Sequence, residues 1–139
     1  MKLVVSMAMV TALAGVVDAA PWTFEVSPAT PTWQRGEKVK VTLTYRNTTK
    51  TSKTIQVMSC SWEDHVGKTD PELTWEPWGC DKNAAMPVKL APGATKSWTL
   101  DMFATKTAKP GAHALKLTFQ PKGEPAPVAS NEVAIEVKP

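Results

Sequence analysis

The sequence predicts an all-β fold, an antiparallel two-sheet sandwich of about seven strands. Apolar and polar residues alternate along most of the chain after Ala20, as in strands that bury one face. Turns containing Pro and Gly separate these runs. No run beyond residue 20 has the spacing of an amphipathic helix. Strands with one apolar face must cover it with a second sheet, which favours a sandwich.

The clearest strand is expected at residues 38–47, "KVKVTLTYRN". Val39, Val41, Leu43 and Tyr45 fall on one face, and polar side chains fall on the other. We therefore expect the apolar face to lie in the core.

The other six strands are expected from the same alternation, and they are residues 22–26, 54–62, 86–90, 97–103, 114–119 and 131–137. This arrangement assigns four aromatic side chains to the core: Phe24, Tyr45, Trp98 and Phe119. Trp22 and Trp33 are expected near the entry of the sandwich, where they would cover its open end.

Three stretches carry a resemblance to a known family: "GEKVKVTLTYRN", "LAPGATKSWTL" and "SNEVAIEV". They resemble bacterial immunoglobulin-like domains of the fibronectin type, over nearly the whole chain after the N-terminal segment. The resemblance implies a fold and no activity, since this fold carries many functions. Antibody-type domains differ, because their disulfide joins opposite sheets across a long stretch. Cys60 and Cys80 are too close for that, so we expect them to join a strand end to a following loop.

The N-terminus predicts export. Lys2, an apolar run over residues 3–17 and a small-residue exit form a secretory signal, with cleavage after Ala19. An uncleaved anchor is the alternative. Residues 20–139 are then expected to form a single immunoglobulin-like domain, monomeric, in the periplasm or outside the cell. No second apolar run predicts a membrane span. The net charge of +3 is too weak to indicate nucleic-acid binding.

Residues 59–82, here called the disulfide segment, hold both cysteines and three of the six tryptophans. In an oxidising compartment Cys60 and Cys80 predict a disulfide. Closing a loop of this length stabilises a fold by about 3 kcal/mol in the chain-entropy model. A reduced metal-binding pair is the alternative, although the spacing is unlike that of zinc sites.

The disulfide segment differs from the rest of the chain in charge. It carries six carboxylates and two lysines, a net −4. Lys2 and Asp18 cancel in the signal, so the remainder of the chain carries +7 to reach the total of +3. An acidic, aromatic loop on a basic body indicates a place for recognition.

The three indoles of the segment are either a lid on the core or a contact surface, since each offers about 150–250 Å² of mostly apolar area. An indole beside carboxylates suits a sugar ring or a cationic side chain. A disulfide would reduce the entropy lost when such a loop binds. The candidate ligand-binding residues are Trp62, Glu63, Asp64, His65, Trp75, Glu76 and Trp78.

No catalytic residue, cofactor or metal site is predicted. The only histidines are His65 and His113, and His113 is expected on the surface after a Pro-Gly turn. Glu63 and Asp64 are adjacent, so on a strand they would point to opposite faces and could not share one glycosidic bond.

Two alternatives stay open beside a non-catalytic binding or accessory module for an unidentified protein or glycan. A periplasmic copper-binding protein would use sulfur and imidazole ligands, and the candidates are Met58, Met86, Met102, His65 and His113. These residues lack close clustering in the sequence. A secreted protease inhibitor would present an extended loop containing Pro71 and Pro77, but no inhibitor signature is present.

Overall fold

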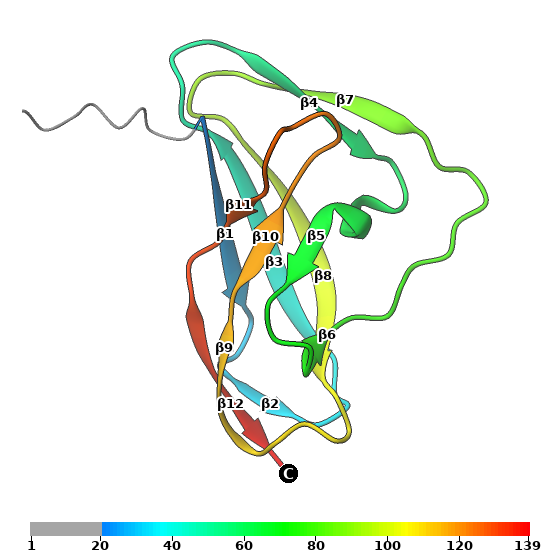
Figure 1. The fold of residues 1–139 in the computed structure, drawn as a ribbon, viewed down its shortest axis with the longest axis vertical. Coiled ribbons are helices and arrows are strands. Elements are labelled where there is room, and N and C mark those ends of the chain that lie inside the picture. Colours follow the sequence, from blue (N-terminus) through cyan, green and yellow to red (C-terminus); the bar gives the residue numbers. More distant parts are fainter. Residues whose placement is uncertain (1–20) are drawn as a thin grey trace, which may run out of the picture.

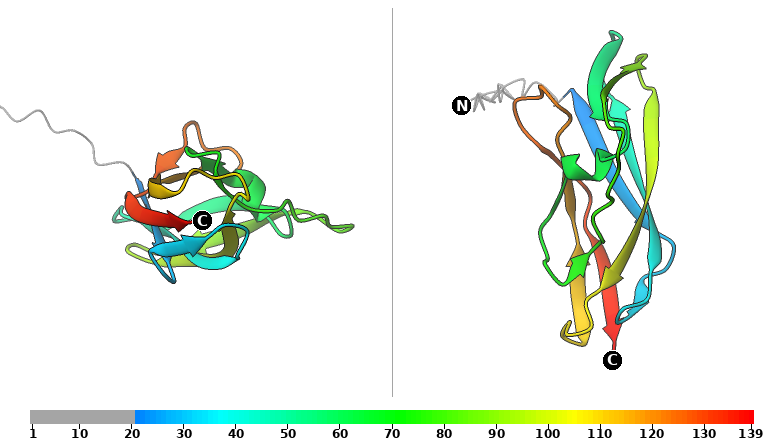
Figure 2. Two further views of the ribbon diagram at one scale, coloured as in Figure 1. Left: turned by 90° about the horizontal axis from the view of Figure 1, so that it is seen from below. Right: turned by 90° about the vertical axis from the view of Figure 1, so that its right-hand side faces the viewer.

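Residues 21–139 are described by the computed structural model, and they form two facing layers of strands (Figures 1 and 2). The edge-on view in Figure 2 separates the layer containing β3 and β8 from the layer containing β10 and β12. The predicted signal, residues 1–19, lies outside the described range. Within that range no helix is long and apolar enough to cross a membrane.

The described residues form twelve strands and one 3-10 turn. The elements are β1 (Trp22–Pro28), β2 (Thr32–Gln34), β3 (Val39–Asn47), β4 (Lys53–Met58), η1 (Trp62–His65), β5 (Val66–Lys68), β6 (Leu73–Thr74), β7 (Ala85–Leu90), β8 (Thr95–Ala104), β9 (Gly111–Leu115), β10 (Leu117–Phe119), β11 (Val128–Ala129) and β12 (Val133–Lys138).

The first layer is a four-stranded antiparallel sheet in the order β1-β3-β8-β6. β3 lies between β1 and β8, and Val41 pairs with Leu100. The four apolar residues predicted for the inner face of β3 are all buried. The period-2 prediction for this strand is therefore confirmed.

The second layer is assembled from shorter pieces. β10 pairs with β11 and β5, while β12 pairs with β9 and, in parallel, with β2. The parallel pair is an exception to the antiparallel prediction. β4 and β7 form an antiparallel ribbon, and a bridge between Gln56 and Lys122 links β4 to the chain that follows β10.

The prediction of a two-sheet sandwich is confirmed, but the structure has more strands than the seven that were predicted. Each of the seven predicted runs contains a strand, and residues 114–119 are divided between β9 and β10. The strands that the sequence did not predict are β2, β5, β6 and β11, which have two or three residues each. Runs this short cannot display an alternation.

Aromatic rings fill the centre of the sandwich. Trp22 stacks on Tyr45 with ring centroids 4.7 Å apart, and Phe119 lies 5.0 Å from both Tyr45 and Trp98. Trp22 and Trp33 are both buried. Trp98, which was predicted in the core, is only partly buried and packs against it.

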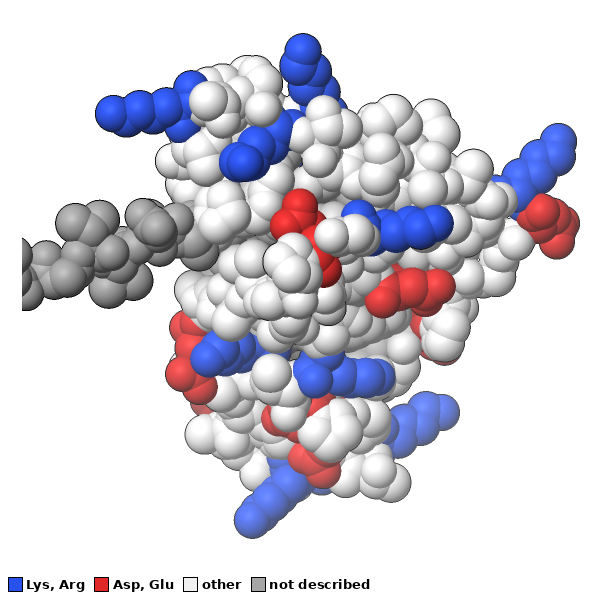
Figure 3. Space-filling model, turned by 45° about the horizontal axis from the view of Figure 1, so that its top comes forward, with Lys and Arg blue, Asp and Glu red and all other residues white. Residues whose placement is uncertain are grey.

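Charged side chains of both signs are interspersed on the face shown in Figure 3. Basic groups outnumber acidic ones towards the upper end, but acidic groups separate them over the middle of the view. On this face the basic side chains therefore do not gather into one patch.

Candidate functional site

The disulfide between Cys60 and Cys80 is formed, with Cα atoms 6.3 Å apart. It joins the chain just after β4 to the loop before β7, which is the predicted connection between a strand end and a following loop. Both cysteines of the chain are used, so the alternative of a reduced metal-binding pair is wrong.

Hydrogen bonds reinforce the base of the disulfide segment. Asn83 Oδ1 accepts from the backbone N–H groups of Cys60 (3.2 Å) and Ser61 (3.3 Å). The backbone N–H of Ser59 donates to the carbonyl of Ala84 at 2.8 Å. The two ends of the segment are therefore held together by more than the sulfur bridge.

The predicted strand at residues 54–62 ends at Met58, and the chain then turns into η1. Glu63 and Asp64 therefore lie on a 3-10 turn and not on a strand. The 3-10 turn points Glu63 inward, with 5% of the residue exposed, and leaves Asp64 exposed. Glu63 Oε1 accepts a hydrogen bond from the backbone N–H of Trp78 at 3.1 Å. A buried carboxylate thus anchors the far side of the segment.

The disulfide segment separates from the first sheet after a short pairing. β6 pairs with Phe103 and Ala104 of β8, and the chain then leaves the sheet (Figure 1). No strand pairs with β8 on this side between Thr95 and Met102 among the described residues. The departing chain and the open edge of β8 therefore bound a space.

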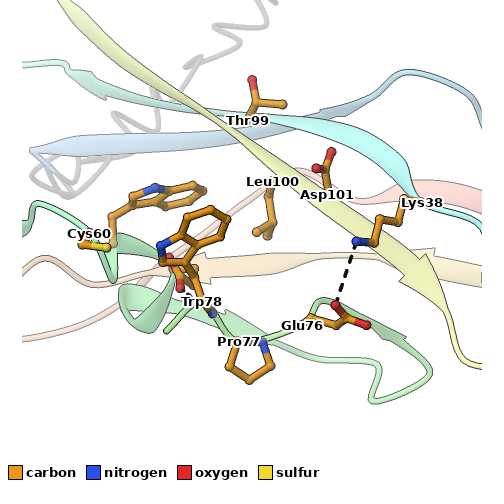
Figure 4. Close-up of a pocket in the computed structure, with 10 residues that line it drawn as sticks. Lys38, Cys60, Glu76, Pro77, Trp78, Thr99, Leu100 and Asp101 are labelled. Atoms are coloured by element: carbon orange, nitrogen blue, oxygen red, sulfur yellow. Dashed lines mark hydrogen bonds and ion pairs between the residues drawn. The ribbon is translucent and has the colours of Figure 1, made fainter. Parts of the chain in front are cut away.

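That space is a groove of about 390 Å³, within the range of about 300–1,000 Å³ usual for ligand pockets. Glu76, Pro77 and Trp78 form one side. Figure 4 shows Thr99, Leu100 and Asp101 of β8 on the other side, with Cys60 towards one end and Lys38 towards the other. Trp62 and Glu63 of η1 complete the lining.

The three indoles of the disulfide segment have different environments. Trp62 stacks on Trp98 at 5.9 Å and packs against the core. Trp75 is also partly buried, and Lys68 Nζ lies 4.9 Å from its ring centroid. Trp78 is 68% exposed. Two of the indoles therefore cover the core, and the third is exposed to solvent.

The lining of the groove is acidic. It contains the carboxylates Glu63, Glu76 and Asp101 and a single ammonium group, Lys38. Lys38 lies 3.9 Å from Glu76, and Asp101 pairs with Lys40 at 3.2 Å, both at exposed positions. Exposed pairs of this kind are weak. Glu63 has no basic partner among the described ion pairs, so it contributes negative charge at the wall.

Four of the seven predicted ligand-binding residues line the groove: Trp62, Glu63, Glu76 and Trp78. Asp64, His65 and Trp75 lie outside its lining. His65 Nε2 accepts from the backbone N–H of Met58 at 3.1 Å, and Nδ1 lies 3.1 Å from the carbonyl of Gln120. These contacts fit a neutral imidazole protonated at Nδ1, which ties η1 to β4 and to the end of β10.

His113 is not on the surface, contrary to the expectation from its Pro-Gly turn. Its side chain is 8% exposed, because it faces the loop at residues 69–72. Nδ1 lies 2.8 Å from Asp70 Oδ2, and Nε2 lies 2.6 Å from the carbonyl of Lys109. The hydrogen bond to Asp70, and after it that to Lys109, raise the pKa of His113 above its usual value, with burial opposing them.

Asp70, Glu72 and His113 are also the described residues that could share a metal ion, since their ligand atoms lie within 4.8 Å of one another. Both imidazole nitrogens already face acceptors, and Glu72 Oε2 is 3.6 Å from Nε2. A metal would need a free lone pair on one nitrogen. The contacts instead fit a protonated imidazole that holds the disulfide segment to β9.

Sequence reasoning missed the half of the groove that comes from outside the disulfide segment. Lys38 lies just before β3, and Thr99, Leu100 and Asp101 belong to a predicted strand. The alternation in that strand indicates which side chains face the core. It carries no signal for which strand edge stays unpaired.

Comparisons with known proteins support the fold and nothing finer. No protein-family model and no curated protein matches the sequence. The native alpha-2-macroglobulin of E. coli is similar over 87% of this chain and 7% of its own, at 20% identity and a TM-score of 0.52. A fragment of that protein from domain MG7 to the C-terminus gives 20% identity, a TM-score of 0.49, and coverage of 87% and 17%. A beta-glucosidase from Listeria innocua gives 16% identity and a TM-score of 0.43, with coverage of 85% and 16%.

The chain therefore spans a small part of each of these much longer proteins. Together with the all-β layers, the first similarity supports an immunoglobulin-like sandwich. Identity of this level shows the fold alone.

Proposed function

We propose that this protein is an exported, non-catalytic binding module whose ligand occupies the groove between residues 76–78 and β8. One observation carries the proposal: Trp78 is 68% exposed at the groove, and its backbone N–H donates to the buried Glu63. The disulfide at Cys80 restrains the chain two residues further on. A large apolar ring fixed in water beside a groove is typical of a recognition surface.

Export rests on the predicted signal at residues 1–19 and on the disulfide, because disulfides persist mainly in oxidising compartments. The absence of catalysis rests on the groove lining. Glu63 Oε1 accepts a hydrogen bond from the backbone N–H of Trp78. No histidine or cysteine thiol lies in the groove among the described residues. Of the five candidates for copper, both histidines already use their two ring nitrogens elsewhere, and the binding module is the better supported function.

The proposal is tested by screening the oxidised protein against a glycan array and a library of linear peptides, then repeating the screen with paired variants. Trp78→Ala and Glu63→Gln alter the groove. Met86→Ala removes another exposed apolar side chain, at 50% exposure, and Asp64→Asn removes the neighbouring carboxylate outside the groove.

The expected result is a set of ligands that the two groove variants lose and the two control variants retain. If every ligand of the parent protein bound the Trp78→Ala and Glu63→Gln proteins equally well, the groove would not be the binding site.

A further inference from the structure

The geometry points to a ligand class for the groove: we propose an extended peptide segment that adds a strand to the free edge of β8 and places a basic side chain against Glu63 and Trp78. This inference rests on the proposed function, which it sharpens from an unspecified ligand to a basic peptide.

Hydrogen bonds at both ends of β8 show which residues face the free edge. The N–H of Thr105 donates to the carbonyl of Glu72 at 2.9 Å, so odd-numbered residues direct their backbone groups towards β6. The carbonyl of Ala94 accepts from the N–H of Asn47 at 3.0 Å, so even-numbered residues face β3. Because this direction alternates along a strand, Thr99 and Asp101 present their N–H and C=O groups to the groove.

The edge is left open by the path of the disulfide segment. β6 covers the backbone of Phe103, but the chain beyond Thr74 moves away from β8. The backbone N–H of Trp78 donates to Glu63 Oε1 at 3.1 Å, and this hydrogen bond holds the departing chain in place. An edge whose backbone groups lack a strand partner is a template for another strand. The stretch of β8 that precedes its pairing with β6 is therefore open to one further strand.

The spacing of the backbone groups favours a peptide over a sugar. Alternate residues of a strand lie about 6.8 Å apart, so the donors and acceptors of Thr99 and Asp101 match those of an antiparallel or parallel peptide. A glycan has no matching repeat of amide groups. Main-chain bonds would supply part of the affinity, and side-chain contacts with the opposite wall would supply selectivity.

The opposite wall favours a basic side chain. Three carboxylates and one ammonium line the groove, and the most buried carboxylate, Glu63, lies beside the backbone of the exposed Trp78. A guanidinium or ammonium group there would gain both charge attraction and contact with an indole face. An acidic peptide would meet repulsion at the same place.

The experiment uses the oxidised, isotope-labelled protein and three libraries of acetylated, amidated pentapeptides. The central residue is Arg, Gln or Glu, and the other positions are mixed. Amide resonances and hydrogen exchange are followed by NMR. We expect the Arg library to shift the Trp78 indole and to slow exchange of the Thr99 and Asp101 amides. The Gln and Glu libraries should bind about tenfold more weakly or less.

Two proline variants test the strand edge itself. Thr99→Pro removes an N–H that faces the groove without removing a bond to β3, a position where strands tolerate proline. Thr95→Pro is the matched control, because Thr95 starts β8 on the same edge and lies outside the groove lining. We expect Thr99→Pro to abolish the slowed exchange of the Asp101 amide and to weaken binding about tenfold, while Thr95→Pro binds like the parent.

If Thr99→Pro fails to fold, N-methylation along the best peptide replaces it, and loss of binding at every second methylated position is expected. The peptide proposal is overturned if no library affects Thr99 or Asp101, or if the Glu library binds best. Glycans that require Trp78 and Glu63 but tolerate Thr99→Pro would overturn it while sustaining the proposed function. A concentration-dependent dimer that protects the same two amides without peptide would assign the edge to a second copy of the chain and overturn it as well.

Discussion

The two halves of the disulfide segment lie within one closed loop, yet they differ in nearly every physical respect. The first half, through Trp75, places Glu63 and Leu73 in the interior and packs Trp62 and Trp75 on the core. The second half, from Glu76 to Lys82, contains no strand and is exposed along most of its length. One loop thus combines a part that covers the core with a part that is exposed to solvent.

The difference arises from where each half finds partners. The first half gains η1, β5 and β6, and β5 and β6 pair with existing strands. The second half has the disulfide, the Glu63 contact and an exposed ion pair to Lys38. Aromatic density alone does not distinguish the half that covers the core from the half that is exposed, because each half contains tryptophan.

The largest effect is expected in the first half, from Leu73→Ala. Leu73 is 1% exposed in β6, so truncation leaves a cavity and should lower the free energy of unfolding by about 2–5 kcal/mol. Urea unfolding measures the change. Glu76→Ala is the matched change in the second half and should stay within about 0.5 kcal/mol. Equal effects at the two positions would remove the distinction between the halves.

The next effect concerns the disulfide that closes both halves. Replacing Cys60 and Cys80 together by Ser should lower the free energy of unfolding by about 3 kcal/mol, because the unfolded chain regains loop entropy. The folded first half should persist, since its contacts do not pass through sulfur. Near-ultraviolet circular dichroism checks this, and collapse of the whole aromatic signal would show that the lid depends on the disulfide.

A smaller, pH-dependent effect is expected where His113 holds the first half to β9. The pKa of His113 is raised in the fold by Asp70 and Lys109. The folded state therefore binds the proton of this imidazole more tightly than the unfolded state does. This stabilisation is complete below the unfolded pKa of about 6.5 and is lost as the pH rises through the folded pKa.

The measurement is urea unfolding across pH for the parent and for His113→Gln, with an NMR titration of the His113 ring. We expect the difference in unfolding free energy between the two proteins to shrink as the pH rises. A ring that titrates at or below the usual histidine value would contradict the protonated clamp.

The smallest effect on stability is expected from Trp78→Ala in the second half, within about 0.5 kcal/mol of the parent. The same change should remove the most readily acrylamide-quenched part of the tryptophan fluorescence, because Trp78 is 68% exposed. Trp62→Ala is the comparison in the first half and should leave that accessible component in place. A stability loss of several kcal/mol in the Trp78→Ala protein would show that this indole packs on the core as Trp62 and Trp75 do.

Much of the fold was predictable from sequence because its signals are local. Alternation placed Val41 and Leu43 in the core, and Pro-Gly turns separated the long strands. The pieces that could not be predicted depend on partners distant in the chain. β6 exists because it meets Phe103 and Ala104, and two residues cannot show a period.

The candidate site was predictable only on the side of the disulfide segment. The disulfide followed from two cysteines close in the sequence of a chain expected to be exported, and the choice of candidate residues in the segment followed from charge and aromatic density. The roles of His65 and His113 could not be inferred, since His65 contacts the carbonyl of Gln120 and His113 contacts the carboxylate of Asp70, both distant in the sequence. The unpaired edge of β8 could not be predicted either, because it depends on where the neighbouring chain after β6 separates from the sheet.

The most direct test of the groove as a binding site is an NMR titration of the oxidised protein with the Arg-centred pentapeptide library, in which the Trp78 indole and the Thr99 amide are followed together. The account predicts that both resonances shift with one saturation curve while the Met86 amide, on the β4–β7 ribbon, stays unchanged. Shifts confined to residues outside the groove, or no shift at Trp78 and Thr99, would contradict it.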